Sequence, residues 1–505
     1  MCNFAIMIAD EWTYRITQQL PFAPTVGQQT LINIFVQFMC DASDRVVMLL
    51  RGSAGTGKTS VARGIVRAMR TMKQKVVLLA PTGRAAKVLG GKTIHRHIYR
   101  QHAYGEDSFC LNNNMHTDTL FIIDEASMIS GIATASIFGS GCLLDDLVKY
   151  VYAGRNCRMM LIGDAAQLPP IGCEESPALI SDYIAGYGLT VYEYDLTEVL
   201  RQAQESGILF NATMIRHMIT HDDITQLPRI HFDGFPDISI CPGNELIEQL
   251  SDSYYHVGVD ETIVITRSNK RANIFNLGIR NQVLDRDAEL CSGDQLMIVK
   301  NNYFWTADSP PALPVGRGPL RASHAEHSPK EAPSLQGGRG ESLFLANGDR
   351  CVVRRVRNHR QLYGFHFADA EVSFPDLDNT DLNVTVILDT LQSEAPALTA
   401  EQQEQLYNNV AEDYADIPTK AARYAEMKKD IYFNALQVKY AYAVTCHKAQ
   451  GGQWQHVYLD QGYMTDDMLI PSYIHWLYTA FTRATDHLYL VNWPKTQVDI
   501  QNLIV

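Results

Sequence analysis

The segment Gly52-Ser-Ala-Gly55-Thr-Gly57-Lys58-Thr59 constrains the fold of this chain more than any other. It follows the apolar run Val46–Leu50 and opens a helix-compatible segment at about Lys58–Met72. Glycines in such a loop let backbone N–H groups curl around phosphate oxygens, and the N-terminus of the next helix adds a positive dipole. The pattern therefore predicts a strand–loop–helix unit that binds the phosphates of a nucleotide.

The polar side chains of this loop have expected tasks. Lys58 would place a point charge against the β- and γ-phosphates, and the Thr59 hydroxyl would ligate Mg²⁺. The alternative is a glycine-rich turn that matches by chance, and the strand before it and the helix after it argue against that. The phosphate-binding residues expected from the pattern are Gly52, Ser53, Ala54, Gly55, Thr56, Gly57, Lys58 and Thr59.

Two further polar segments each follow an apolar run. They are the pair Asp124-Glu125 and the segment Gly163–Pro170, which contains Gln167. Doubly wound sheets bind ligands at the carboxyl ends of their strands, so we expect Asp124 on the Mg²⁺ side and Glu125 as the group that polarises the attacking water. Gln167 is expected to sense the γ-phosphate. A solvated turn is the alternative for each, and for Gly163–Pro170 alone the two interpretations are equally good.

Short apolar runs alternate with helix-compatible segments in the first third of the chain and return near its end. Continuous apolar strands between helices argue for a parallel sheet covered on both faces. The expected fold class is therefore α/β with two such sheets. The expected strands are Val46–Leu50, Val76–Leu79, Leu120–Ile123 and Met159–Ile162, followed by Thr262–Thr266, Val457–Leu459 and Leu488–Val491.

Different material lies between the late strands. Asp308–Glu341 is rich in proline and glycine and cannot bury enough apolar surface to order itself, so we expect a flexible insertion that interrupts a domain. An inert insertion is favoured over a functional loop. Cys351–Asp389 suggests a small β module, and a polar helical stretch is expected at about Ala400–Lys429.

Composition limits the remaining classes. A chain of 505 residues is long enough for roughly two to four domains. The net charge of −13 does not favour nucleic-acid binding, although a locally basic groove is compatible with acidic outer faces. The ten cysteines are scattered singly, which argues against a zinc site and a disulfide scaffold and for a cytoplasmic protein. No run approaches the ~20 apolar residues of a membrane span, so no membrane partner is expected.

Taken in order, these segments resemble those of the superfamily 1 helicases, in the 5′→3′ branch of RecD-like and Dda-like enzymes. Six further segments support this resemblance, which spans about Thr25–Ala484. Two of them, Ala80–Ala86 and Thr93–His95, are similar to the first DNA-contacting blocks. Thr25-Val-Gly-Gln28 is similar to the adenine-reading segment, and Leu196–Gln202 to the block that supplies a catalytic arginine. Thr445–Gly451 resembles the family's Thr-x-His-Lys-x-Gln-Gly block, and Tyr478–Ala484 resembles the final block.

The resemblance implies a two-lobed motor that uses ATP and Mg²⁺ and acts on single-stranded DNA and duplex junctions. The implied RecA-like lobes are residues 1–200, and residues 201–300 with 439–505. A hairpin insertion would lie at about 99–116, and an SH3-like β insertion with the polar helix would occupy 343–438.

The resemblance also implies roles for single residues. Gln28 would read adenine, and Arg201 and Arg483 would act as arginine fingers. The implied DNA contacts are Pro81, Thr82, Thr93, His95, Thr445, His447 and Lys448.

Alternatives stay open at this point. An RNA motor is one, because the nucleotide engine hardly depends on the sugar of the strand. A P-loop NTPase that does not act on nucleic acid is another, but it leaves Thr445–Gln450 and Arg483 unexplained. The aromatic residues Tyr303, Phe304, Trp305 and Trp454 are candidates for base stacking, although aromatic side chains more often fill cores.

Overall fold

The computed structural model describes residues 2–101, 109–133, 138–198, 205–221, 226–306, 344–377, 379–465 and 468–499. The chain divides into two compact units. Unit 1 comprises Met1–Tyr99, Ser108–Arg267 and Val444–Val505, and unit 2 comprises Arg100–Asp107 and Ser268–Ala443. Arg201 and the predicted insertion Asp308–Glu341 lie outside the described residues. Within the described ranges, no helix has both the length and the apolar character needed to cross a membrane.

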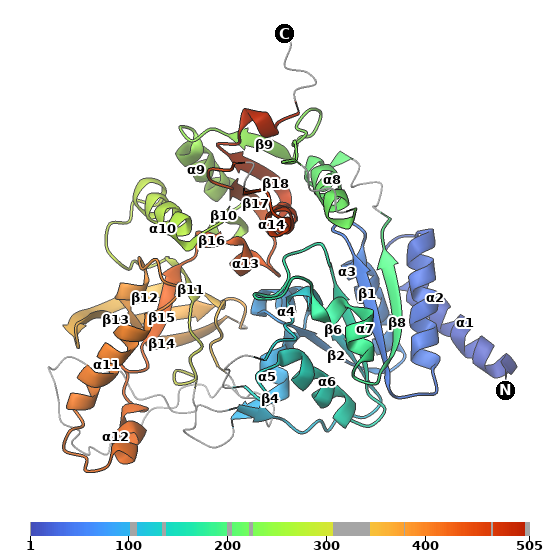
Figure 1. Ribbon diagram of the computed structural model, residues 1–505, viewed down its shortest axis with the longest axis horizontal. Coiled ribbons are helices and arrows are strands. Elements are labelled where there is room, and N and C mark those ends of the chain that lie inside the picture. The colour runs from blue at the N-terminus through green and yellow to red at the C-terminus, as the bar shows by residue number, and fades with distance from the viewer. Residues whose placement is uncertain are drawn as a thin grey trace, which may run out of the picture. The chain divides into compact units, whose positions relative to one another are not determined.

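The first sheet of unit 1 is parallel, with the strand order β3-β2-β6-β7-β1-β8 (Figure 1). Its central strands are almost wholly buried, as their continuous apolar sequences predict. All four strands expected here from the sequence are confirmed. The strands are β1 (Val46–Gly52), β2 (Lys75–Ala80), β3 (Lys92–Thr93), β6 (Thr119–Ile123), β7 (Arg158–Gly163) and β8 (Thr190–Leu196).

Helices cover both faces of this sheet. One face packs alternate strand residues, such as Met48, Ile122 and Met160, against α2 and α3 in a single apolar core. The helices on this side are α1 (Cys2–Gln18), α2 (Val26–Cys40) and α3 (Lys58–Thr71). The others are α4 (Gly83–Leu89), α5 (Ile94–Ile98), α6 (Leu143–Ala153) and α7 (Ser181–Ala185). The six-stranded sheet and its helices are called the first lobe below.

Two short strands, β4 (Tyr99–Gln101) and β5 (Phe109–Leu111), pair in the region where the hairpin insertion is predicted. The residues between them lie outside the described part of the chain.

The second sheet of unit 1 has the order β16-β10-β17-β18-β9, and the pairs β10–β17, β17–β18 and β18–β9 are parallel. It confirms the second α/β sheet and its three expected strands. The strands are β9 (Ile238–Cys241), β10 (Thr262–Thr266), β16 (Ala443–Thr445), β17 (Trp454–Asp460) and β18 (Ala484–Val491). The helices around it are α8 (Gly207–Thr220), α9 (Leu246–His256), α13 (Cys446–Ala449) and α14 (Pro471–Phe481). This sheet and its helices are called the second lobe.

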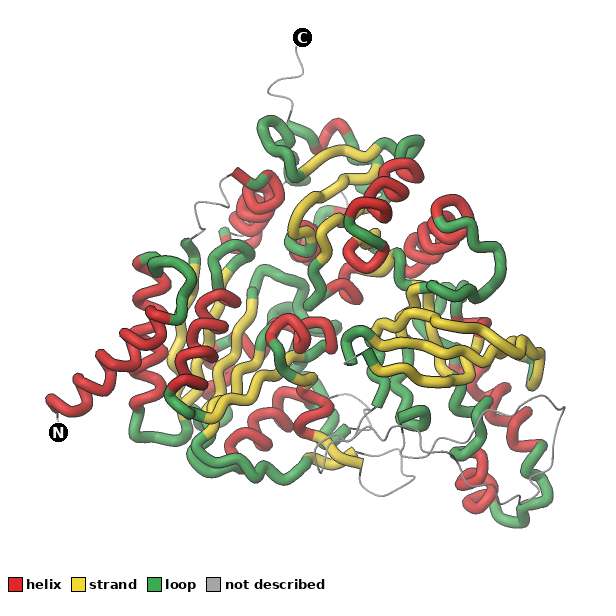
Figure 2. The backbone as a smooth tube through the Cα atoms, turned by 180° about the vertical axis from the view of Figure 1, so that it is seen from behind, coloured by secondary structure: helices red, strands yellow, loops and turns green. Residues whose placement is uncertain are grey.

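Unit 2 is built on a closed five-stranded barrel (Figure 2). Its first strand precedes the predicted insertion and pairs with the strand that follows it. The barrel strands are β11 (Gln295–Ile298), β12 (Arg350–Leu362), β13 (Phe365–Phe374), β14 (Thr380–Ile387) and β15 (Leu436–Tyr440). The helices are α10 (Asn269–Gly278), α11 (Ala400–Glu412) and α12 (Lys420–Met427).

The expectation of one polar helical stretch at Ala400–Lys429 is wrong in one respect, because the stretch is two helices. α11 ends at Glu412, and α12 begins after Thr419, whose side chain caps it. Pro418 explains the break, since the proline ring is incompatible with a helix interior.

Candidate nucleotide site between two lobes

The predicted phosphate loop joins β1 to α3. Gly55 and Gly57 adopt positive φ angles of 77° and 85°, which only glycine reaches at little cost. The Lys58 ammonium donates to the carbonyl oxygens of Gly52 (2.6 Å) and Ser53 (2.8 Å). Thr59 lies in the first turn of α3 and is partly exposed. The loop thus offers a helix N-terminus and a lysine charge in one place, which suits an anion.

Gln28 ties helix α2 to this loop. Its side chain completes a capping box with Thr25, in which Gln28 Oε1 accepts the Thr25 N–H at 3.2 Å. Its Nε2 donates to the carbonyl oxygen of Thr56 at 3.3 Å. Both Gln28 and Thr56 have no solvent-exposed surface.

Asp124 and Glu125 stand at the carboxyl end of β6, which lies between β2 and β7 in the sheet. Glu125 has a φ of 52°, an uncommon value for a residue with a Cβ, and its N–H donates to Asp124 Oδ1 at 2.9 Å. Burial raises the pKa of both carboxyl groups, whereas the Lys58 charge lowers both. Arg483 lowers the pKa of Glu125 further. The predicted acids and these two cations therefore share one electrostatic environment.

The loop Gly163–Pro170 after β7 is held by helix α14 of the second lobe. The Leu168 N–H donates to Thr479 Oγ1 at 2.8 Å, and His475 Nδ1 lies 2.9 Å from the Ala166 carbonyl oxygen. On the other side, Gln450 Nε2 donates to the Leu168 carbonyl oxygen at 2.7 Å. Both backbone groups of Leu168 thus bind side chains of the second lobe.

Gln167 lies within this loop and is 6% exposed. Its Oε1 is buried and accepts no hydrogen bond from the described residues. A buried amide oxygen without a donor is costly, so this atom is suited to a ligand or a water molecule.

Tyr478 of α14 connects the phosphate loop to the Gly163–Pro170 loop. Its hydroxyl oxygen accepts the Ala54 N–H at 3.1 Å, and its O–H donates to Asp164 Oδ2 at 2.5 Å. Tyr478 and Asp164 are each 1% exposed. Burial raises the pKa of Tyr478, and so does the Asp164 charge. The hydroxyl therefore stays protonated and donates a hydrogen bond to Asp164.

Arg483 is only 2% exposed and is fixed by three groups of its own lobe. Its guanidinium donates to the carbonyl oxygens of Thr479 (3.0 Å) and Gly452 (3.2 Å) and to the Thr482 hydroxyl (3.0 Å). These contacts hold its charge where Glu125 feels it.

The predicted DNA contacts of the first lobe lie where β2 and β3 end. Pro81 follows β2, and the Thr82 and Thr93 hydroxyls cap α4 and α5 by accepting N–H groups at 3.3 and 3.4 Å. Each hydroxyl still has its own hydrogen to donate. His95 packs against the rings of Tyr99 and Phe138, and burial lowers its pKa to about 4, so it is neutral at pH 7.

The predicted DNA contacts of the second lobe, Thr445, His447 and Lys448, lie at α13. Thr445 precedes the helix, and His447 and Lys448 are exposed. Arg84 of α4, in the first lobe, contacts the segment that follows α13 in the second lobe. It donates to the Gln453 carbonyl oxygen and stacks on the Trp454 ring, 4.2 Å from its centroid.

Two of the aromatic candidates for base stacking belong to cores instead. Trp305 of unit 2 is 1% exposed and donates its indole N–H to the Asn434 carbonyl oxygen at 2.9 Å. Trp454 of unit 1 is 3% exposed. Neither presents a free ring face to a base.

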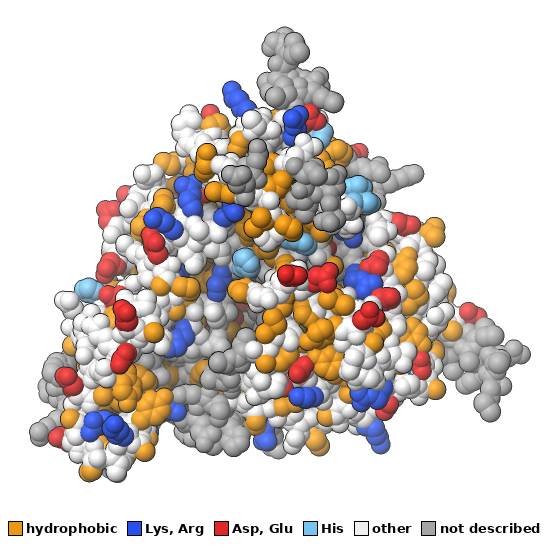
Figure 3. Space-filling model, viewed as in Figure 1, with side chains coloured by type: hydrophobic (Ala, Val, Ile, Leu, Met, Phe, Trp, Pro, Cys, Tyr) orange, Lys and Arg blue, Asp and Glu red, His pale blue; other side chains and the backbone are white. Residues whose placement is uncertain are grey.

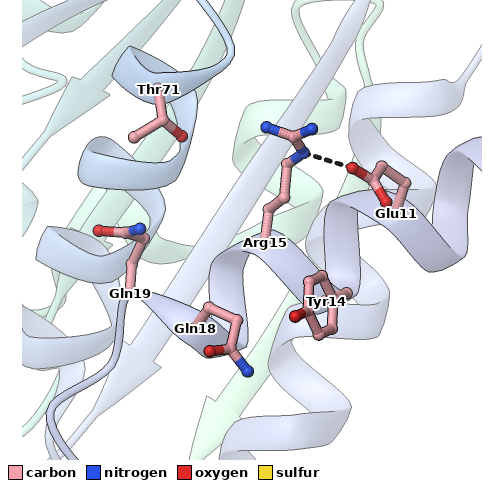
Figure 4. A pocket seen from close by; sticks show the side chains of 6 residues that line it. All are labelled: Glu11, Tyr14, Arg15, Gln18, Gln19 and Thr71. Carbon is pink, nitrogen blue, oxygen red and sulfur yellow. Dashed lines mark hydrogen bonds and ion pairs between the residues drawn. The ribbon is translucent and has the colours of Figure 1, made fainter.

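The open hollow in Figure 4 lies away from this site. It is lined by side chains of α1 and the segment after it, among them the ion pair Glu11–Arg15, and by Thr71 at the far end of α3 from Lys58. An α-helix rises 1.5 Å per residue, so the two ends of α3 are ~20 Å apart. On the face shown in Figure 3, acidic and basic side chains are interspersed.

Known proteins match the chain at both lobes. The AAA domain family matches residues 27–226, and the UvrD-like helicase C-terminal domain family matches residues 440–491. The ATP-dependent RecD2 DNA helicase of Deinococcus radiodurans is 30% identical over 175 residues, which are 34% of this chain and 22% of that protein. The ATP-dependent DNA helicase Dda of Enterobacteria phage T4 is 25% identical over 297 residues, 56% of this chain and 62% of that protein. The chain is a relative of the superfamily 1B helicases.

This superfamily 1B relative spans only part of the curated proteins it matches. An uncharacterised protein of Methanocaldococcus jannaschii is 24% identical over 88% of the chain, but the match covers 36% of that protein. Each of these three relatives is covered over less than two thirds of its length. Among solved structures, a Bacteroides Pif1 helicase in complex with ADP-AlF3 and single-stranded DNA is 15% identical, with 95% of both chains covered and a TM-score of 0.46.

Sequence reasoning assigned no role to several side chains that the structure brings to this candidate site. Tyr478, Thr479 and Gln450 lie in segments that carry the family resemblance, but His475 lies in none. No local pattern marks them, because their partners are 282 to 424 residues away in sequence.

Proposed function

We propose that this chain is an ATP-dependent DNA helicase that moves 5′ to 3′ on single-stranded DNA and couples ATP hydrolysis to duplex unwinding. The observation that carries the proposal is the grip of α14 on the first lobe, through Tyr478 on the phosphate loop and through Thr479 on the Gly163–Pro170 loop. Such contacts let a change at the γ-phosphate alter the fit between two lobes.

The residues of the cleft then have definite tasks. Lys58 leaves the carbonyls of Gly52 and Ser53 for the β- and γ-phosphates, and Arg483 stabilises the charge that develops in the transition state. Glu125 polarises the attacking water, and burial makes it a stronger base than a solvated glutamate. Gln167 uses its unbonded Oε1 to accept a hydrogen of that water. Arg201, which the family resemblance also implies, stays a prediction.

Magnesium fits the donor set at the start of α3 and the end of β6. The Thr59 hydroxyl and the Asp124 carboxylate are hard oxygen ligands of the kind that Mg²⁺ prefers. When bound, the ion would supply positive charge to the phosphate oxygens. The same charge would oppose the effect of burial on Asp124 and keep it ionised.

The strand would run past the ends of β2 and β3 and past α13. Pro81, Thr82, Thr93 and His95 of the first lobe are small or neutral polar groups, which suits phosphate and sugar contacts that do not read sequence. Thr445, His447 and Lys448 would make the contacts of the second lobe. Gln450 follows them by two residues and holds Leu168, so DNA contact and nucleotide contact meet at one loop.

Unwinding of tailed duplexes tests this proposal. A duplex with a 5′ single-stranded tail should be separated in the presence of ATP and Mg²⁺, and one with a 3′ tail should not. Single-stranded DNA should stimulate ATP hydrolysis more than RNA of the same sequence. A hydrolysis rate that neither strand changes would contradict a nucleic-acid motor, and stronger stimulation by RNA would identify an RNA motor.

A further inference from the structure

Gln28 occupies the position that the family resemblance assigns to adenine reading, but its side chain is enclosed. It has no solvent-exposed surface, and neither does Thr56, the phosphate-loop residue that it contacts. A base cannot contact the Gln28 amide in this arrangement unless the residues that cover it move. The backbone N–H of the preceding residue, Gly27, is itself covered, because it donates to Glu198 Oε2 at 3.2 Å.

Both ends of the Gln28 amide are engaged. Oε1 accepts the Thr25 N–H, and Nε2 donates to the Thr56 carbonyl oxygen. These partners fix the orientation of the amide, because the N–H needs an acceptor and the carbonyl needs a donor. A glutamine that reads adenine instead uses its oxygen and nitrogen together on the N6 and N7 edge of the base.

The orientation of the Thr56 carbonyl, which Gln28 holds, affects the phosphate-binding amides directly. The peptide between Thr56 and Gly57 is planar, so the orientation of the Thr56 C=O sets the opposite direction for the Gly57 N–H. Gly57 has a φ of 85° and precedes Lys58 at the start of α3. The Gly57 N–H is therefore one of the amides that curl around phosphate.

The Thr56 side chain extends the same brace. Its hydroxyl donates to the Ser53 carbonyl oxygen at 2.8 Å, and that oxygen also accepts from Lys58 Nζ at 2.8 Å. The brace thus runs from the capping box of α2 through Thr56 to the Ser53 carbonyl, which Lys58 leaves when it turns to the phosphates. None of its contacts involves a group that distinguishes one nucleobase from another.

We propose that Gln28 is a positioning residue of the phosphate loop and does not read the base. It acts on every nucleoside triphosphate alike, by holding the Thr56–Gly57 peptide in the orientation that phosphate needs. The inference rests on the proposed function only for its choice of nucleotide, since it concerns binding and not movement along DNA.

Nucleotide binding tests this inference without hydrolysis. The dissociation constants of the non-hydrolysable analogues of ATP and GTP are measured for the wild type, Gln28→Ala and Gln28→Glu. Glutamate keeps an oxygen for the Thr25 N–H but has no donor for Thr56. Loss of one hydrogen bond should weaken both analogues about five- to tenfold in both variants, and the ratio of the two constants should stay within twofold of the wild type.

Two results would overturn the inference. One is weaker binding of the ATP analogue with unchanged binding of the GTP analogue, which is what loss of a base reader produces. The other is wild-type binding of both analogues by both variants. Gln29→Ala is the matched control, because Gln29 is the next residue of α2 and its side chain donates to Asn33 Oδ1 at the helix surface, away from the phosphate loop. A failure of DNA unwinding would contradict the proposed function but leave this ratio unaffected.

Discussion

Tyr478→Phe removes one oxygen atom from the contact between the two lobes and keeps the ring. In the wild type, that oxygen accepts the Ala54 N–H of the phosphate loop and donates to Asp164 Oδ2. The variant leaves both partners in place and removes the hydroxyl that joins them. Its effect should therefore report the bridge and not the packing of α14.

The expected size follows from the burial of the partners. Asp164 is 1% exposed and keeps one bond in this loop, from the Ala166 N–H to Oδ1 at 3.1 Å. A buried polar group that loses its partner costs about 1–3 kcal/mol. If the transition state for hydrolysis loses this stabilisation in full, kcat/KM for ATP falls by roughly 5- to 150-fold.

DNA-stimulated ATP hydrolysis measures this effect, and Tyr473→Phe is the matched control. Tyr473 is another buried tyrosine of α14, and its hydroxyl donates to Gln461 Oε1 at 2.7 Å within the second lobe. Both variants should lose some thermal stability, but only Tyr478→Phe should lose kcat/KM. Wild-type kcat/KM in a folded Tyr478→Phe protein, or an equal loss in Tyr473→Phe, would refute the bridge.

Three further predictions concern Glu125 and Gln450 of the candidate site and Lys439, a buried lysine of the barrel strand β15. Glu125→Gln should lower the rate of ATP hydrolysis by about 10²- to 10⁴-fold, and an unchanged rate would exclude Glu125 as the base. The variant should also melt at a higher temperature than the wild type at pH 8 but not at pH 4. The reason is that burial raises the pKa of Glu125 in the folded protein, so its carboxyl group destabilises the fold only as pH rises through that pKa. Gln450→Ala should reduce the stimulation of ATP hydrolysis by DNA about tenfold, because the bond to the Leu168 carbonyl oxygen is lost. Gln453→Ala is the control, since this side chain is exposed, and it should leave the stimulation unchanged. Equal stimulation in the wild type and both variants would contradict a coupling of DNA contact to nucleotide contact through Gln450. Burial lowers the pKa of Lys439 to about 8 from the usual 10.5. Between these two pH values the unfolded chain binds a proton that the folded chain does not, so the free energy of unfolding rises with pH. Thermal melts at pH 8 and pH 10 should show this rise in the wild type but not in Lys439→Met, and an equal rise in both proteins would show that Lys439 is not buried.

The parts of the site that the sequence predicts are local. Gly55 and Gly57 occupy positions whose positive φ angles demand glycine, and Lys58 follows them at the first turn of a helix. Asp124 and Glu125 follow a strand that is apolar throughout because helices cover both faces of the sheet. Strand, turn and helix are each determined within a few residues, so their order can be read directly.

The parts that the sequence does not predict depend on packing between distant segments. Tyr478 and Ala54 are 424 residues apart, and no periodicity relates them. The burial of Gln28 is of the same kind, because an N-terminal glutamine of a helix is ordinarily free to turn toward a ligand. Trp305 also could not be assigned, since an aromatic side chain suits a core and a stacking surface equally.

Some signals were local and still ambiguous. Pro418 and the capping residue Thr419 mark the break between α11 and α12, but the polar composition of the whole stretch favours one helix. β11 has only four residues and precedes the insertion, so its place in the barrel depends on pairing with β12 and β15, which sequence alone does not specify.

The central claim is that one triphosphate is held by the phosphate loop of the first lobe and by Arg483 of the second. DNA-stimulated ATP hydrolysis by Lys58→Ala and Arg483→Ala tests it most directly. Arg483→Lys is measured in addition, because the alanine variant also loses the bonds that Arg483 makes to the carbonyl oxygens of Gly452 and Thr479 within its own lobe. Both alanine variants should lose stimulated hydrolysis by at least about 10³-fold, the size of an arginine-finger effect, and Arg483→Lys should lose most of it while it keeps its fold and binds nucleotide. Wild-type hydrolysis by a folded Arg483 variant would contradict the two-lobed site.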